Sequence, residues 1–353
     1  MPDLIVAGGG MAGLVAAAQA REDGAEVVVY EKGDRTGGSM LLSSGVVWRH
    51  RDFADFRRDC PGGMPELQRL VHNSLDGDIA WLEGLGAEVV ERSTGNPLTT
   101  GVRFATRSLT DVLTRHAGDV RLREPLLALP PGIPVVLATG GFQADRGLVR
   151  RYVTPNADEV RLRATPWSTG DGLRLGIEAG AATTDGLDEF YGRNMPAPPA
   201  RVRESDFVEL AQLYAHVASV RNADGETYRT RTWSEIDVVQ WTARQPGARA
   251  YYEVTESRLG ETVRGRTVGA MIDGAERAGG LVRREDGTVT VEVVAGITTT
   301  LGGLKVDTAA QVAPGVFAAG SDVGGIATGG YSSGLATALV LGRVAARSAL
   351  GNR

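Results

Sequence analysis

Residues 4–31, LIVAGGGMAGLVAAAQAREDGAEVVVYE, determine the fold of this chain. The apolar run Leu4–Ala7 ends in three glycines and predicts a buried strand. Small and apolar residues from Met11 to Arg21 predict a helix packed closely on a sheet, and Glu26–Glu31 predicts a second strand rich in β-branched residues. A strand, a helix and a strand in this order require a parallel pair with a right-handed crossover. The sequence therefore predicts a doubly wound α/β domain.

Gly8, Gly10 and Gly13 form the pattern G-x-G-x-x-G, in the strand-to-helix context in which it binds dinucleotides. Gly8 permits the tight turn, Gly10 lets the backbone approach a pyrophosphate, and Gly13 lets helix and strand pack closely. The helix N-terminus offers free N–H groups to the phosphates. Glu31 ends the second strand, where a carboxylate can accept hydrogen bonds from ribose hydroxyls. A glycine turn that binds nothing is the alternative, and these features together argue against it.

FAD and NAD share this pattern, and three later segments favour FAD. TGGS at 36–39 directly follows the ribose carboxylate, where small residues let the chain run along a diphosphate. ATGG at 138–141 ends a predicted strand, PVVLA at 134–138, at the sheet edge where ligands of such sheets bind. AGSD at 319–322 ends the last strand, and the N-terminus of the helix near Ser333 suits a flavin oxygen that gains negative charge on reduction.

In their order along the chain these motifs resemble a flavoprotein family that contains fumarate reductases, succinate dehydrogenase flavoprotein subunits, aspartate oxidases and 3-ketosteroid dehydrogenases. The matching segments are VAGGGMAGLVAA, VVVYEK, TGGSMLLSSGVVW, VVLATGGF, STGDGLRLGIEAGA, TTTLGGLKVD, VFAAGSDVGG and SSGLATALVLGRVAA. Some members attach FAD covalently through a histidine after the ribose acid. The corresponding stretch here, RTGGSMLLSSG, has none, so the resemblance implies non-covalent FAD.

The resemblance and the motifs together predict a set of cofactor-binding residues spread over both ends of the chain. They are Gly8, Gly10, Met11, Ala12, Gly13, Glu31, Lys32, Gly37, Gly38, Ser39, Met40, Ser44, Gly45, Thr139, Gly140, Asp171, Gly320, Ser321, Asp322, Ser333, Gly334 and Leu335.

The middle of the chain differs from both ends. From Arg201 to about Arg284 the charge rises, aromatic residues cluster and the glycine motifs disappear. We expect residues 1–188 and 293–353 to form a discontinuous, Rossmann-like FAD-binding domain, because the strand VFAA and the helix SSGLATALVLG complete the fold begun at Leu4. Residues 189–292 are expected to form a smaller, inserted α+β capping domain, shortened relative to that of the family.

Two anion-binding residues of fumarate reductases are missing. Their histidine before the T-x-G-G element is replaced by Thr299, and the run GGIATGGYSSGL at 324–335 has no arginine. Since such charge-assisted contacts are worth about 1.5–3 kcal/mol each, a fumarate-like dicarboxylate is not expected. The pattern is closer to the 3-ketosteroid dehydrogenase branch and predicts a small, neutral substrate.

Tyr331 and Arg283 are the candidate catalytic residues. Tyr331 stands among small residues, so its ring could face the flavin and its hydroxyl could polarise a carbonyl; ordinary packing is the alternative. Arg283 follows a glycine pair late in the cap, in a place comparable to that of the family's proton-donating arginine. Its alternative is a solvated charge run. The substrate is expected between the flavin and the cap. Tyr331 and Arg283, together with Thr299 and Thr300, are expected to line this cleft.

The predicted function is an FAD-dependent dehydrogenase or ene-reductase, in which hydride moves between flavin N5 and a carbon–carbon bond beside a carbonyl or carboxylate. A flavin oxidase acting on a carbon–nitrogen bond and a non-catalytic FAD-binding subunit are the alternatives. The partners would be the small-molecule substrate and an unidentified electron donor or acceptor.

Composition limits the remaining classes. The net charge of -5 offers no basic block for a nucleic acid. Cys60 is the only cysteine, so no disulfide framework or metal-ligand cluster is expected, and a reducing, cytoplasmic compartment fits. The apolar start lacks a positively charged region ahead of it, so it is not expected to be a signal peptide. No apolar run reaches the roughly 20 residues of a membrane-spanning helix.

Overall fold

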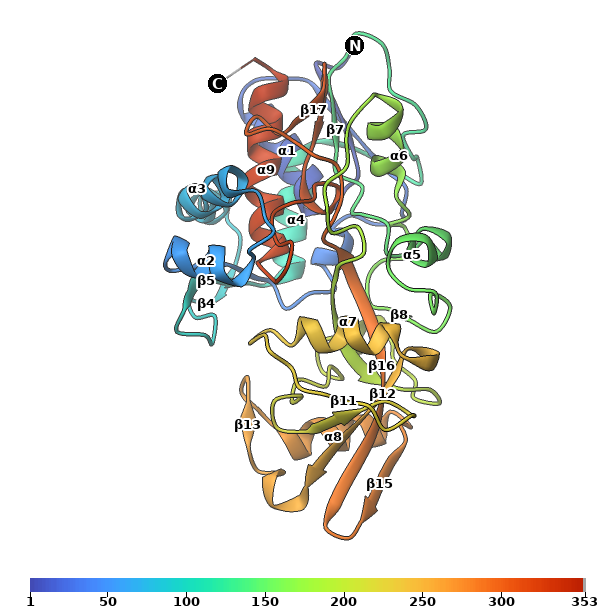
Figure 1. Ribbon diagram of the computed structural model, residues 1–353. Helices are drawn as coiled ribbons and strands as arrows, with labels where there is room; N and C mark the ends of the chain where they lie inside the picture. Colours follow the sequence, from blue (N-terminus) through green and yellow to red (C-terminus); the bar gives the residue numbers. More distant parts are fainter. Residues whose placement is uncertain (352–353) are drawn as a thin grey trace. The chain divides into compact units, whose positions relative to one another are not determined.

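The computed structural model describes residues 1–351. The chain divides into two compact units, which are described separately (Figure 1). Unit 1 contains Met1–Asp145, Thr165–Glu189 and the chain from Thr299 onward. Unit 2 contains Arg146–Ala164 and Phe190–Thr298.

Unit 1 is built on a six-stranded sheet with the order β17-β18-β7-β1-β2-β6. The strands are β1 (Leu4–Ala7), β2 (Val27–Glu31), β6 (Asp119–Leu122), β7 (Val135–Leu137), β17 (Gln311–Ala313) and β18 (Val316–Ala318). All neighbouring pairs are parallel except β17 with β18 at the edge. The buried runs LIVA and VVL therefore occupy the centre of the sheet, as expected for strands covered on both faces. The predicted α/β fold is confirmed.

Three helices of unit 1 pack together beside this sheet (Figure 1). They are α1 (Met11–Glu22), α4 (Thr106–Ala117) and α9 (Gly334–Ala349). Helix α9 approaches α1 closely because Gly342 has no side chain: a Cβ there would lie 2.7 Å from the carbonyl oxygen of Ala12. The C-terminal helix is thus part of the core that the first strand begins.

The remaining elements of unit 1 surround these. A small antiparallel sheet has the order β3-β5-β4. Its strands are β3 (Val46–His50), β4 (Val89–Glu91) and β5 (Thr99–Phe104), and the nearby helices are α2 (Phe53–Asp59) and α3 (Pro65–Gly84). Helix α6 (Asp171–Glu178) and the short 3-10 turns η1 (Gly38–Met40) and η5 (Gly320–Asp322) complete the unit.

Unit 2 is organised around the long strand β16 (Thr288–Thr300), in a sheet with the order β11-β10-β12-β16-β15. Strands β8 and β9 also pair with β16. The strand bounds are β8 (Arg161–Leu162), β9 (Phe190–Pro196), β10 (Ser219–Arg221), β11 (Thr227–Tyr228), β12 (Arg249–Thr255) and β15 (Val282–Glu285). The other elements are α5 (Arg146–Tyr152), α7 (Ile236–Arg244), α8 (Val268–Arg277), a hairpin of β13 (Thr262–Val263) with β14 (Arg266–Thr267), and the turns η2 (Glu204–Asp206), η3 (Pro246–Ala248) and η4 (Glu256–Arg258).

The division differs from the predicted domain boundaries in two places. Residues 146–164, predicted within the FAD-binding domain, belong to unit 2, and unit 2 continues to Thr298 rather than to residue 292. The reason is long-range pairing. Strand β8 pairs with β16, the Arg163 guanidinium donates to Thr298 Oγ1 at 2.8 Å, and the Thr154 hydroxyl donates to the carbonyl of Ala243 at 2.7 Å.

Within residues 1–351, no helix has the length and apolar character to span a membrane. The same range contains no group of three or more His, Cys, Asp or Glu side chains placed to hold a metal ion.

Candidate functional site

The turn between β1 and α1 has a shape that only glycine allows. Gly8 has φ of +107°, and a Cβ on it would lie 2.2 Å from the carbonyl oxygen of Ala138. A Cβ on Gly13 would lie 1.8 Å from the carbonyl oxygen of Gly8. Both positions therefore fix how strand and helix meet, as the sequence predicts.

Gly10 differs, because it faces open space. The nearest atom to a Cβ built on Gly10 is the Cα of Gly38, 4.0 Å away. Gly10 is also the N-cap of α1, and it has no side chain that could cap the helix. No N-cap side chain therefore accepts a hydrogen bond from the first-turn N–H groups, which include those of Met11 and Ala12. Such an end is suited to an anion. The gap beside Gly10 thus fits a diphosphate.

A second segment runs alongside this gap. The Gly37 N–H donates to the carbonyl oxygen of Gly9 at 2.8 Å, and Gly10 and Gly37 form a parallel bridge. Gly37 and Gly38 both have positive φ, of +97° and +51°. The TGGS segment therefore lies beside the glycine turn, which is consistent with the predicted path along a diphosphate. Of the other residues predicted here, Met40 and Gly45 are buried, Ser39 is half-buried and Ser44 is exposed.

Glu31 is buried, with 8% of its surface exposed. One carboxylate oxygen accepts the Gly9 N–H at 2.6 Å and the other accepts the Gly33 N–H at 2.5 Å. The carboxylate therefore holds the glycine turn as well as ending β2. Since each carboxylate oxygen carries two lone pairs, this anchoring leaves acceptor capacity for a ribose hydroxyl.

Lys32 and Asp171, both predicted to contact the cofactor, are paired with each other. The Lys32 ammonium lies 2.9 Å from an Asp171 carboxylate oxygen and donates to the Thr169 hydroxyl at 2.5 Å. This joins the end of β2 to the first turn of α6, where a carboxylate also favours the helix dipole. The pair is about one-third exposed, with side-chain exposures of 36% and 28%.

Asp322 anchors the loop after β7. It is 1% exposed, and its carboxylate accepts the Thr139 N–H at 2.5 Å and the Gly141 N–H at 2.9 Å. The Thr139 hydroxyl donates to the same carboxylate at 3.0 Å and accepts the Gly172 N–H at 2.8 Å. Burial raises the pKa of Asp322, and these hydrogen bonds oppose that rise. Asp322 is therefore a positioning residue for the loop after β7, and its predicted contact with the cofactor stays a prediction.

The start of α9 also faces open space. The Ser333 hydroxyl caps the helix by accepting the Ala336 N–H at 3.2 Å, so this predicted residue acts on the helix end. A Cβ on Gly334 would meet no atom within 4 Å, and Leu335 beside it is half-buried. Gly320, with φ of +67°, brings η5 close to α1, because its Cβ would lie 2.9 Å from the Cβ of Ala12. Two helix N-termini and the ends of parallel strands thus meet at one sheet edge.

Tyr331 is half-buried against Trp48, with ring centroids 5.6 Å apart. Behind Trp48 lies His50, which the sequence left without a role. The His50 ring is buried, 5.4 Å from the Trp48 ring, and its Nε2 lies 3.1 Å from an Asp59 carboxylate oxygen. Burial lowers the pKa of His50, and Asp59 opposes this. His50 therefore packs against Trp48 and supports the contact between Trp48 and Tyr331. No sequence motif indicates this role of His50.

Thr299 and Thr300, both predicted to line the substrate cleft, lie in different environments. Thr299 is half-buried and its hydroxyl donates to that of Ser321 at 2.7 Å. Thr300 is 3% exposed, and within residues 1–351 its hydroxyl has no hydrogen-bond partner. It is packed against Gly141, where a Cβ would lie 2.5 Å from its oxygen, so it does not line a cleft as expected.

Arg283 is exposed on β15, paired through its backbone with Thr290. An arginine that donates a proton needs a desolvated site, and the exposed position of Arg283 does not provide one. The prediction of a catalytic Arg283 is therefore replaced by the charge-run alternative. The adjacent Arg284 supports this, because it forms an exposed ion pair with Glu276 at 2.9 Å.

Together the glycine turn, the buried ribose-side carboxylate and two helix N-termini at one sheet edge define a dinucleotide-binding flavoprotein. Residues 3–124 and 132–336 match the family described as FAD binding domain. The chain belongs to this family, and the predicted FAD cofactor is confirmed.

Similar proteins agree with this assignment. A probable fumarate reductase of Shewanella frigidimarina is 24% identical, over 98% of this chain and 74% of the relative. The fold matches an open conformation of a flavocytochrome c3 fumarate reductase with a TM-score of 0.74 and 22% identity, covering 99% of this chain and 78% of that one. It also matches a 3-ketosteroid-Δ4-(5α)-dehydrogenase of Rhodococcus jostii with a TM-score of 0.72 and 18% identity, covering 99% and 96%. These relatives favour oxidoreduction of CH–CH groups over the carbon–nitrogen oxidase and non-catalytic alternatives.

Proposed function

We propose that this FAD-dependent oxidoreductase acts on the CH–CH group beside a carbonyl of a small, neutral organic substrate. FAD, when bound, supplies or accepts the hydride. The main observation in support is a pair of neutral hydroxyl groups, those of Thr299 and Ser321, which lie 2.7 Å apart. Thr299 stands where the fumarate reductases have an anion-binding histidine.

The surroundings of this pair support a neutral substrate. The run 323–335 contains no charged residue. The Glu189 carboxylate accepts the N–H of Gly329 within this run at 2.7 Å. The run itself therefore offers an anionic substrate no charge-assisted bond. A neutral enone, such as the 4-androstene-3,17-dione bound by the Rhodococcus enzyme, needs no such bond.

The chain's own residues would divide the remaining work. The first turn of α1 would bind the diphosphate and Glu31 would orient the ribose. The open N-terminus of α9 at Gly334 would stabilise negative charge at the end of the flavin that faces it. Tyr331, held by Trp48, would donate a hydrogen bond to the substrate carbonyl and handle the proton that accompanies the hydride.

The proposal also covers how FAD is attached, the electron partner and the cellular location. FAD is held non-covalently, since residues 35–45 offer no histidine for attachment. An electron donor or acceptor outside the chain closes the cycle. The lone, buried thiol of Cys60 supports a cytoplasmic location.

Anaerobic stopped-flow spectroscopy tests the substrate class. Holoenzyme reduced with dithionite is mixed with 4-androstene-3,17-dione, with a small cyclic enone or with fumarate, and flavin reoxidation is followed. The oxidised holoenzyme is mixed with the corresponding saturated ketones and flavin bleaching is followed. We expect a saturable reaction with a neutral compound in one direction and none with fumarate. Turnover of fumarate that exceeds that of every neutral compound would overturn the proposal.

A further inference from the structure

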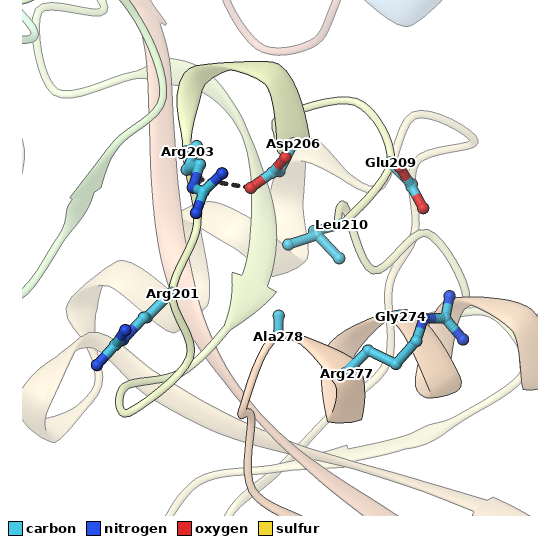
Figure 2. A pocket seen from close by; sticks show the side chains of 8 residues that line it. All are labelled: Arg201, Arg203, Asp206, Glu209, Leu210, Gly274, Arg277 and Ala278. Carbon is cyan, nitrogen blue, oxygen red and sulfur yellow. Dashed lines mark hydrogen bonds between the residues drawn. The ribbon is translucent and has the colours of Figure 1, made fainter.

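Unit 2 carries a pocket of about 360 Å³ that no part of the proposed reaction uses (Figure 2). It lies between the segment 201–210, which follows β9, and the C-terminal half of α8. Its volume is at the lower end of the roughly 300–1,000 Å³ that is typical of small-molecule sites. The backbone N–H of Arg201 donates to the carbonyl of Ala278 at 2.8 Å, which ties the two walls together.

The pocket has an apolar floor formed by Leu210, Gly274 and Ala278. Gly274 lies inside α8, where glycine is less favourable than alanine. A Cβ on Gly274 would lie 3.4 Å from Leu210 Cδ2 and 3.9 Å from Arg277 Nη2. Alanine would therefore fit in ordinary contact and would occupy part of the floor. Glycine at this position keeps space open.

The rim is cationic. Arg201, Arg203 and Arg277 border the pocket (Figure 2), and over residues 1–351 none of the three guanidinium groups forms an ion pair. Arg284, near the same helix, is instead paired with Glu276. Three unpaired guanidinium groups around one pocket offer bidentate donors to a planar anion.

The two acidic residues at the rim neutralise it only in part, because three guanidinium groups stand against two carboxylates. The Asp206 carboxylate accepts the Arg203 N–H at 2.8 Å and the Ser205 hydroxyl at 2.8 Å, and these bonds lower the pKa of Asp206. This carboxylate is therefore committed to the η2 turn. Glu209 lies beside Arg266, whose guanidinium donates to the Glu209 carbonyl. A positive surplus remains at the rim.

We propose that this pocket binds a small organic carboxylate, with its carboxylate held by Arg203 and Arg277 and its carbon body on the floor of Leu210 and Gly274. An inorganic anion would satisfy the arginines but leave the floor uncovered. The proposal is independent of the reaction at the flavin, because every lining residue belongs to unit 2.

Isothermal titration of the FAD-loaded full chain with benzoate tests the site. We expect saturable binding at one site, with the flavin spectrum unchanged. Arg203→Met and Arg277→Met should each weaken it at least about tenfold, as loss of a charge-assisted bond requires. The matched control, Arg284→Met, should leave it unchanged. No binding at millimolar benzoate, or binding that neither substitution alters, would overturn the proposal.

Gly274→Ala separates a ligand site from a merely structural glycine. The variant should unfold at a higher temperature, since alanine favours the helix, and yet bind benzoate more weakly because its methyl group fills the floor. A higher unfolding temperature with unchanged affinity would contradict the site. Inorganic phosphate, titrated in parallel, should bind less tightly than benzoate; the reverse order would refute the assignment to an organic acid.

Discussion

Tyr331 is the residue on which the proposed chemistry depends most directly. Tyr331→Phe keeps the ring packed on Trp48 (5.6 Å between centroids) and removes only the hydroxyl. We expect flavin oxidation or reduction by a neutral substrate to slow by about 10²–10⁴-fold, the usual cost of losing an acid–base group, with FAD content unchanged. Tyr30→Phe is the control. The Tyr30 hydroxyl accepts a hydrogen bond from Arg121 at 3.3 Å, between the neighbouring strands β2 and β6, and has no role in the proposed chemistry. A loss below about tenfold would remove Tyr331 from proton chemistry.

Glu31 carries a second prediction about a single residue. Glu31→Gln replaces one acceptor oxygen with an NH₂ group that opposes the N–H of Gly9 or Gly33. We expect FAD to bind about 10- to 100-fold more weakly, since a hydrogen bond to a charged group is worth about 1.5–3 kcal/mol. Fluorescence quenching during reconstitution of apoprotein measures this. Asp34→Asn, an exposed carboxylate in the same loop, should leave FAD affinity unaltered, and an equal effect of both changes would contradict a specific role.

At the level of elements, α9 is fastened to α3 and α1 by one buried charge network. The Arg343 guanidinium donates to the Asp78 carboxylate and, at 2.7 Å, to the Gln19 side-chain oxygen. Both charged side chains are about one-tenth exposed, at 10% and 12%. Burial raises the pKa of Asp78 in spite of Arg343, so desolvation is the larger effect. The network specifies how three helices meet.

Removing one partner of this pair should cost more than removing both. Arg343→Met leaves Asp78 buried and uncompensated, and we expect a loss of about 3–5 kcal/mol in the free energy of unfolding. Adding Asp78→Leu should restore much of that loss. Urea denaturation of the two variants measures the difference. A double variant less stable than Arg343→Met would contradict this explanation, because the unpaired Asp78 would then not be the source of the loss.

Across the whole molecule, both units bury carboxyl groups whose pKa is raised by desolvation: Asp78 and Asp322 in unit 1, and Glu235 in unit 2. Glu235 is 3% exposed and has a positive φ of 59°. Arg193, Arg264 and His216 partly oppose the rise in its pKa. A raised folded-state pKa means that the native state binds more protons than the unfolded state. Stability contributed by such a group is therefore lost as the pH rises from the ordinary carboxyl pKa through the folded pKa.

The pH dependence of unfolding follows from this sign. Glu235→Gln cannot ionise, so its unfolding temperature minus that of the unaltered protein should increase as the pH rises above about 4.3, the ordinary glutamate value. Calorimetry over a pH series measures the difference. Gln keeps the size of the side chain, and Glu226→Gln, exposed in the same unit, is the control. A difference that is constant or shrinks with pH would contradict the raised pKa.

The local sequence was enough to predict the FAD-binding part of the chain. Gly8 and Gly13 must be glycine because a Cβ would collide with neighbouring backbone, at 2.2 and 1.8 Å. Such steric requirements act over a few residues and leave a readable pattern. The same holds for the buried strands and for the helix cap at Ser333. A dinucleotide cofactor followed from these short-range rules, whereas the family and the neutral position Thr299 followed from the resemblance of the motifs to known flavoproteins.

Only the tertiary structure decided the features that depend on distant segments. Residues 146–164 joined unit 2 because β8 found its partner in β16 more than a hundred positions later. Asp322 proved to be an anchor for Thr139 and Gly141, 183 and 181 positions away, and Arg283 proved to be exposed. Burial and hydrogen-bond partners arise from the packing of remote elements, whose energies are not written in any local pattern. The sequence by itself therefore determined that this protein binds FAD. The fold decided which side chains are exposed, buried or hydrogen-bonded, and so which could take part in catalysis.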